Sequence, residues 1–239
     1  MSPLSPQDLG DFRSALKTGK RQLSRGNAKE AERYLLRALA TTDYFEDQIV
    51  KNEKKAFVLH RLAEVYILEG EPINAHKCFR EALKLSNAGN QMGHARLLRD
   101  YGNFERIQGH DKSGLKRVNQ AIDILESQPQ SRDRVKKELL VTQGFLARFY
   151  VNDPDRRESA IETWQVIARE LRGYKKKAYE LANLRCLIDA LPFYSLERTQ
   201  YIQRAVLLSF RLGNYKKAGE YAALLGGKPA RSVFRFMVR

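Results

Sequence analysis

Three segments of the chain repeat one spacing of small and bulky residues, and this repetition constrains the fold more than any other feature. The segments begin at Gly26, Gly70 and Gly109. Each has a small residue five positions after the glycine, a bulky apolar residue four further on and an alanine three beyond that. These residues are Ala31, Leu35 and Ala38; Ala75, Phe79 and Ala82; and Gly114, Val118 and Ala121. Small residues at this spacing let two helix backbones approach closely, so the pattern predicts packed helix pairs.

An apolar stripe precedes each glycine and predicts the first helix of each pair. Before Gly70 the stripe repeats at i, i+3, i+4 and i+7, the spacing of one buried helical face, through Leu59, Leu62, Ala63 and Tyr66. Before Gly109, Gly102 takes the small position. A helix pair cannot bury its stripe alone, so repeated pairs are expected to stack into one continuous core.

Two further pairs follow with less regular sequences. A helix over 139–150, a turn at 152–154 and a second helix form one pair, and the second helix carries Ala160, Trp164 and Ile167. A helix over 196–212 leads to Gly213 and Ala218, and another helix lies over 174–191. The sequence therefore predicts about eleven helices, most of them in five pairs, and no strands. We expect an all-α repeat domain over 12–226, a loose or capping start over 1–11 and a basic tail over 227–239.

The pattern resembles the tetratricopeptide repeat (TPR), in which a bulky residue, Leu-Gly and Tyr precede Ala-x3-Phe-x2-Ala. The second unit matches best, through Leu59, Leu62, Ala63, Tyr66, Gly70, Ala75, Phe79 and Ala82. The terminal proline of the family is absent, and the glycines are 70 − 26 = 44 and 109 − 70 = 39 positions apart, against about 34 in the family. Residues 41–47 are one place for the extra length. The resemblance implies a right-handed α-α superhelix of about five hairpins, similar to the long-helix variants of bacterial sensor and regulator proteins.

The resemblance also implies a partner-binding groove lined by the first helix of each pair. The family's groove offsets select Lys20, Phe57, His60, Glu64, Arg96, Arg99, Asn103, Arg106, Phe145 and Arg148. Three arginines on one helix suit carboxylates or phosphates, because the guanidinium pairs with them through two donors. A solvated helix face paired with its neighbour is the alternative. The family's chaperone-carboxylate clamp is not reproduced, since Lys20, Arg61 and Asp100 stand at its positions.

The net charge of +15 is concentrated toward the C-terminal end. Residues 171–239 hold 14 Lys and Arg against four acids, a net of 14 − 4 = +10, which leaves 15 − 10 = +5 for the first 170 residues. An acidic partner (nucleic acid, an acidic protein or a membrane surface) would explain this, as would a merely soluble basic surface. The candidate basic patch is Lys175, Lys176, Lys177, Lys216, Lys217, Arg231, Arg235 and Arg239.

No residue set predicts catalysis, a cofactor or a metal site. His60 and Glu64 have the i, i+4 spacing of some metal pairs, but no second histidine or cysteine is near in sequence, so we expect an exposed polar pair. Cys78 and Cys186 are expected to be buried reduced thiols of a cytoplasmic protein. No stretch is long and apolar enough to span a bilayer, and no secretory signal is predicted.

These observations favour a non-enzymatic adaptor or sensor that holds a segment of a partner protein, of acidic character, in the groove. Replacement of Arg99 or Arg106 by glutamate is then expected to weaken partner capture without changing the melting temperature. Nucleic-acid binding through the basic C-terminal half is the first alternative, and a scaffold subunit of a larger complex is the second. The sequence leaves the oligomeric state open.

Overall fold

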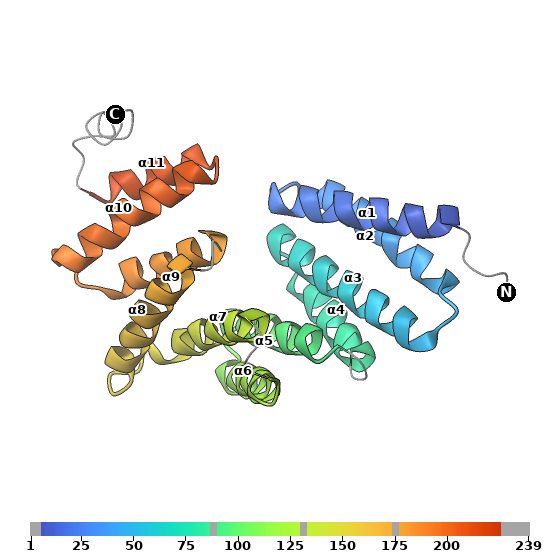
Figure 1. Ribbon diagram of the computed structural model, residues 1–239, viewed down its shortest axis with the longest axis horizontal. Coiled ribbons are helices and arrows are strands. Elements are labelled where there is room, and N and C mark those ends of the chain that lie inside the picture. The colour runs from blue at the N-terminus through green and yellow to red at the C-terminus, as the bar shows by residue number, and fades with distance from the viewer. Residues whose placement is uncertain (1–5, 87–89, 130–132, 174–176, 226–239) are drawn as a thin grey trace. The chain divides into compact units, whose positions relative to one another are not determined.

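A computed structural model describes residues 6–86, 90–129, 133–173 and 177–225, and every regular element within these ranges is helical. As predicted, the described part of the chain contains eleven α-helices, most of them in sequential pairs, and the architecture is an all-α TPR-like solenoid (Figure 1). The chain divides into two compact units, Met1–Gln128 and Pro129–Arg239. None of the described helices is both long enough and apolar enough to cross a bilayer.

The first unit consists of three helix pairs. Its elements are α1 (Pro6–Ser24) with α2 (Ala28–Thr41), the short 3-10 helix η1 (Thr42–Tyr44), α3 (Gln48–Glu69) with α4 (Pro72–Leu85), and α5 (Gln91–Ile107) with α6 (Asp111–Glu126). The predicted extra length over 41–47 contains η1. It ends at Asp47, whose Oδ1 accepts hydrogen bonds from the backbone N–H groups of Ile49 and Val50 and so caps α3.

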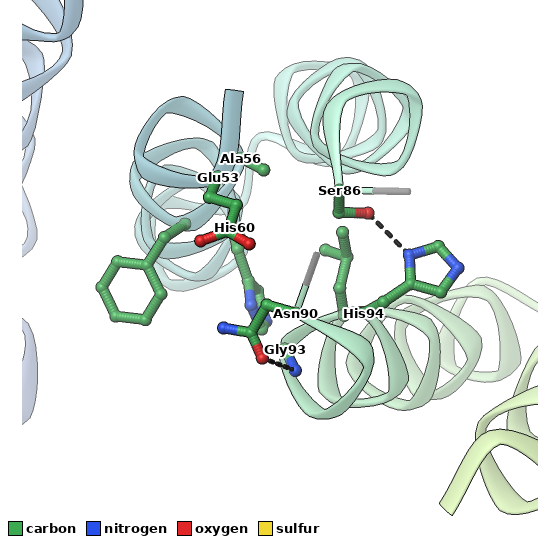
Figure 2. Close-up of a pocket in the computed structure, with 9 residues that line it drawn as sticks. Glu53, Ala56, His60, Ser86, Asn90, Gly93 and His94 are labelled. Carbon is green, nitrogen blue, oxygen red and sulfur yellow. Dashed lines mark hydrogen bonds between the residues drawn. The ribbon is translucent and has the colours of Figure 1, made fainter. Parts of the chain in front are cut away.

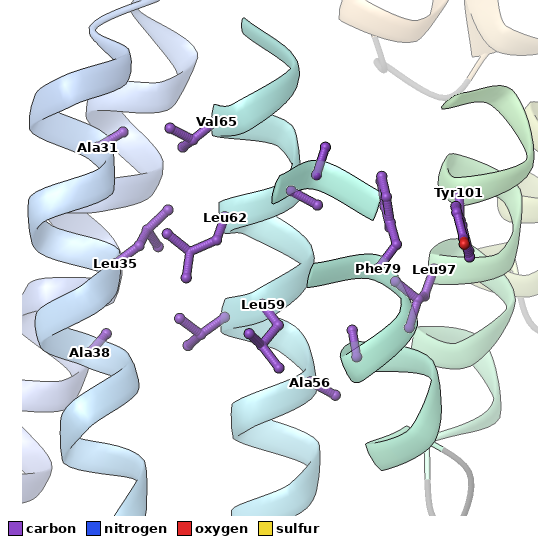
Figure 3. Packing of buried hydrophobic residues seen from close by; sticks show 14 of the residues in the cluster. Ala31, Leu35, Ala38, Ala56, Leu59, Leu62, Val65, Phe79, Leu97 and Tyr101 are labelled. Carbon is purple, nitrogen blue, oxygen red and sulfur yellow. The ribbon is translucent and has the colours of Figure 1, made fainter. Parts of the chain in front are cut away.

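The repeated small and bulky positions form the core of this unit, as the sequence predicts. All three signature residues of α2 and all three of α4 have no exposed surface. In Figure 3 the side chains of Leu35 on α2 and Leu62 on α3 point toward each other between the two helices. The ring of Phe79 stacks on that of Tyr101 with centroids 4.9 Å apart, which joins the second pair to the third.

The predicted glycine turns are also confirmed. Gly26, Gly70, Gly109 and Gly213 have φ angles of 80°, 75°, 82° and 72°. Only glycine adopts this left-handed region without a steric penalty, so it ends one helix and redirects the chain into the next.

The second unit contains α7 (Asp133–Tyr150), α8 (Arg157–Gly173), α9 (Lys177–Ala190), α10 (Leu196–Arg211) and α11 (Tyr215–Ala223). Trp164 is buried in its core, and its Nε1 donates to the Gly144 carbonyl oxygen across 2.9 Å, which ties α8 to α7. Asn183 Nδ2 donates to the Trp164 carbonyl oxygen across 2.7 Å and ties α9 to α8. Helices α7, α8 and α9 are therefore joined by polar bonds in the core as well as by apolar contacts.

Helix α1 begins at Pro6, inside the segment expected to be a loose or capping start, and the two compact units both lie within the range expected to form the repeat domain and its flanking segments. Among the predicted basic residues, Lys175, Lys176, Arg231, Arg235 and Arg239 lie outside the described part of the chain.

Candidate functional site

A hollow of about 350 Å³ lies in the first unit against α1, α3 and the residues that follow η1. Its apolar wall is formed by Phe12, Leu16, Phe45 and Phe57. Phe12 and Phe45 meet edge to face with ring centroids 5.4 Å apart, so α1 and the connection after η1 hold each other in place. The hollow has the size and lining to accept an apolar side chain from another molecule.

Cationic side chains surround this apolar wall. Arg13, which is exposed, and Lys54 also line the hollow, with Glu53 and Asn90 as its other polar members. Phe57 is 37 % exposed. The Nζ of Lys20 lies 5.5 Å and the guanidinium carbon of Arg61 5.3 Å from its ring centroid. The exposed ring therefore lies within cation–π distance of two positive charges.

A second, smaller hollow of about 50 Å³ adjoins the first, since Glu53, Phe57 and Asn90 line both (Figure 2). Asn90 accepts a hydrogen bond from the Gly93 backbone N–H at 2.9 Å and caps α5. On the far side, Ser86 and the Nδ1 of His94 are 2.7 Å apart, and burial lowers the pKa of His94. The two hollows form one continuous polar and aromatic surface from α1 to the start of α5.

His60 also lines the smaller hollow, and it connects α3 to α5 within a network of charged groups. The Nε2 of His60 lies 3.0 Å from Asp100 Oδ2, and its Nδ1 lies 3.3 Å from Arg61 Nη2. A guanidinium nitrogen can only donate, so Nδ1 accepts and Nε2 carries the hydrogen that is donated to Asp100. Arg61 also donates to both carboxylate oxygens of Glu64, at 2.6 and 2.8 Å, and Arg99 Nε donates to Asp100 Oδ1 at 2.8 Å.

The surroundings shift the pKa values of the two carboxyl groups in opposite directions. Burial acts to raise the pKa of Asp100, but the Arg99 guanidinium and the hydrogen bond from His60 outweigh it and hold that pKa well below its usual range. Burial raises the pKa of Glu64 despite the opposing charge of Arg61. Asp100 is therefore the firmly ionised member of the pair.

His60, Glu64 and Asp100 also place three potential metal-ligand atoms within 4.8 Å of one another. Sequence reasoning missed Asp100, which completes this set from α5. Each carboxylate already accepts from an arginine, however, and a divalent cation would have to lie beside both guanidinium groups. These residues fit a hydrogen-bonded charge network better than a metal site.

Similarity searches found neither a matching family model nor a matching curated protein. Solved structures do match. Aspartyl phosphate phosphatase F from Bacillus subtilis superposes with a TM-score of 0.64 at 12 % identity, over 96 % of this chain and 59 % of that one. PilF of Pseudomonas aeruginosa matches with a TM-score of 0.51 at 20 % identity, over 97 % and 99 % of the two chains. TPR-like repeats of a Podosopora anserina protein described as a kinesin light chain match with a TM-score of 0.54 at 15 % identity, over 84 % of this chain and 96 % of that one.

The chain has a TPR-like fold. The predicted signature residues and these matches agree on this point, and at such identities the likeness shows the fold alone.

Within the TPR-like fold, the predicted groove residues of the first unit occupy different depths. Lys20 and Phe57 are exposed, whereas Glu64, Arg96, Asn103 and Arg106 are half-buried. His60 and Arg99 are each only 4 % exposed. Arg99 lines neither hollow, so the prediction that it offers contact surface is wrong, whereas His60, although almost fully covered, lines the smaller hollow. Arg99→Glu would place a second carboxylate beside Asp100, so the expectation that this change leaves melting unaltered does not hold.

Phe145 and Arg148, the last two predicted groove residues, lie on α7 in the second unit. The Arg148 guanidinium carbon is 4.2 Å from the Phe145 ring centroid, and both side chains line a hollow of about 30 Å³ beside Trp164 and Asn183. The structure therefore does not assign them to the hollow of the first unit.

The TPR resemblance did not identify several residues that form the hollow. Phe45 and Asn90 lie between helices, where no periodic signal exists, and only folding brings them to α3. Phe12 does begin the apolar spacing of α1, with Ala15 and Leu16 following it, so hydrophobic periodicity could have identified it.

Proposed function

We propose that this protein is a non-enzymatic adaptor or sensor that binds a segment of a partner protein on the first unit. An apolar side chain of that segment enters the hollow at Phe12, Phe45 and Phe57, and acidic groups beside it pair with Arg13, Lys54 and Lys20. The observation that supports this most directly is an apolar hollow of about 350 Å³ with cations at its edge. Clustered aromatic side chains with basic neighbours are typical of binding hot spots.

The charges available at this surface favour an acidic partner. Glu64 and Asp100 are engaged by Arg61, Arg99 and His60, so they contribute little free negative charge. Among the described residues that line the larger hollow, Glu53 is the one acid. Both cysteines are free thiols, which supports the proposed cytoplasmic location.

Selection from a displayed library of random peptides tests the proposal. The unmodified chain should enrich peptides with a bulky apolar residue next to aspartate or glutamate. Phe57→Ala should weaken binding of the enriched peptides roughly tenfold or more, as loss of a hot-spot aromatic does. The same selection with the Lys54→Glu variant should enrich fewer peptides with aspartate or glutamate, because the new glutamate repels these residues.

Ile73→Ala serves as the matched control, because Ile73 is a large apolar residue that is 83 % exposed on α4, away from the hollow. This variant should bind the enriched peptides like the unmodified chain. Equal binding by Phe57→Ala and the unmodified chain, or enrichment without acidic and apolar residues, would exclude the proposed site.

A further inference from the structure

One end of the second unit collects basic side chains from four helices. At this end α8 ends and α9 begins. Because α9 and α10 form a hairpin, the end of α10 and the start of α11 lie at the same end of the unit. The terminal turns at this end contain five exposed cations: Arg172, Lys177, Arg211, Lys216 and Lys217. We call this set the basic end.

Ion pairs confirm the alignment of three of these helices. Glu180, in the first turn of α9, is 3 % exposed and accepts from Arg204 Nε of α10 at 2.9 Å, and Arg172 Nε of α8 lies 4.0 Å from the same carboxylate oxygen. On α11, Tyr221 contacts Arg185 of α9. Two helical turns, or about 11 Å, separate Arg185 from the start of α9 and Tyr221 from the turn that precedes α11. Lys177 therefore lies at about the same level as that turn.

The acidic residues of these turns do not neutralise the basic end. Glu180 is buried between Arg204 and Arg172, and Glu170 is the other acid in the four terminal turns. Glu220 lies one turn further along α11. Lysines in the first turns of α9 and α11 also add to the positive ends of these helix dipoles. A strongly positive surface of this kind attracts polyanions.

An exposed aromatic ring lies among these cations. Tyr215 is 64 % exposed, immediately precedes Lys216 and Lys217, and is held by an edge-to-face contact with Phe210, with centroids 5.0 Å apart. A site that binds only phosphates needs only positive charge, whereas a site that also binds an unpaired base typically offers an aromatic ring on which the base stacks. Cations around an exposed ring therefore favour single-stranded nucleic acid, whose bases are free to stack.

We propose that the basic end binds single-stranded nucleic acid, with phosphates at Lys177, Arg211, Lys216 and Lys217 and one base on Tyr215. This site is separate from the hollow of the first unit, so either can fail without the other. An acidic protein would be held by charge alone and would not depend on the Tyr215 ring.

The phosphate part is tested by fluorescence anisotropy of the full chain with a labelled oligothymidylate of about 15 nucleotides over a series of salt concentrations. Lys216→Ala/Lys217→Ala should weaken binding and reduce the slope of log affinity against log salt by about 1.4, about 0.7 for each phosphate contact. Lys112→Ala/Lys116→Ala removes the same charge from exposed positions on α6 of the first unit and is the matched control. An equal loss in the control would show attraction by overall charge and would overturn the proposal.

The stacking part is tested with two variants of Tyr215. Tyr215→Leu keeps an apolar contact for Phe210 but removes the ring, and should weaken binding roughly tenfold with little change in salt slope. Tyr215→Phe should bind like the unmodified chain, and circular dichroism should show α11 intact in both. The proposal is overturned if the oligonucleotide does not bind, if Tyr215→Leu binds normally, or if polyglutamate or phosphatidylserine vesicles compete as well as the unlabelled oligonucleotide.

Discussion

His60 donates from Nε2 to Asp100 Oδ2 across 3.0 Å, and this hydrogen bond joins the second helix pair of the first unit to the third. On the Asp100 side, Arg99 supplies the balancing positive charge. On the His60 side, Arg61 donates to the other ring nitrogen. Both polar groups of the imidazole are therefore satisfied beneath the proposed binding surface, and loss of any member leaves a charged or polar group without its partner.

Asp100→Asn should lower the free energy of unfolding by about 3 kcal/mol at pH 7, because it removes the charged acceptor of the hydrogen bonds from the buried Arg99 and His60. Urea denaturation followed by circular dichroism measures this. Asp123→Asn is the control, since Asp123 is exposed on α6, and should change stability by no more than about 0.5 kcal/mol. Equal effects of the two substitutions would show that the network contributes nothing to stability.

The difference in free energy of unfolding between the unmodified chain and Asp100→Asn should become smaller at acidic pH. The folded-state pKa of Asp100 is held below its usual range, so below about pH 4 the unfolded chain takes up a proton that the folded chain does not. Stability from this carboxylate is therefore complete above its unfolded pKa and is lost as the pH falls toward the folded one. The raised pKa of Glu64 acts in the opposite direction, stabilising the folded chain at low pH, but Glu64 is present in both proteins. Unfolding measured at several pH values from 7 to below 4 should show the two proteins converging, and a constant difference would contradict the assignment.

Gly102→Ala should destabilise the first unit by roughly 2 kcal/mol, as overpacking of a close helix contact does. An added Cβ would lie 2.6 Å from the Gly114 carbonyl oxygen and 2.9 Å from Val118 Cγ2 on α6, so one backbone would have to move. Gly10→Ala is the matched control in α1, where an added Cβ meets no atom within 4 Å. It should be neutral or stabilising by about 0.5 kcal/mol. Thermal and urea unfolding compare the two, and an unchanged stability in Gly102→Ala would show that α5 and α6 are not in close contact there.

Cys78 should react slowly with thiol reagents. Burial raises the pKa of its thiol to about 11, so at pH 8 the reactive thiolate is roughly 100-fold scarcer than in an ordinary cysteine. The rate of reaction with Ellman's reagent, measured in a Cys186→Ala background, should be lower by about that factor. Unfolding the same variant in guanidinium should restore an ordinary rate, and a fast reaction in the folded protein would contradict the raised pKa of the half-buried Cys78 thiol.

Zinc should not stabilise the protein through His60, Glu64 and Asp100. The two carboxylates are held by Arg61 and Arg99, and a bound dication would repel both guanidinium groups at short range. The melting temperature should therefore be the same with excess zinc and with a chelator. A zinc-dependent rise in melting temperature that His60→Ala abolishes would establish a metal site.

Much of the local structure is predictable from the sequence because it depends on contacts at fixed spacing. The alanines of α2 and α4, the bulky Leu35 and Phe79, and the turn glycines each act through neighbours a few residues away or in the adjacent helix. The groove offsets were less informative. Arg99 and Lys20 were both selected as groove residues, yet Arg99 is buried, with its guanidinium donating to Asp100, and Lys20 is exposed.

The sequence by itself determined the helices, their pairing and the closely packed positions, because periodicity and small-residue spacing act within single helices and adjacent pairs. Only the tertiary structure placed Phe45 and Asn90 beside Phe57, Asp100 beside His60, and Lys177 at the same end as Lys216. These residues lie on different elements, and their distances depend on how far each helix slides and rotates against the next. A linear pattern carries no measure of that displacement.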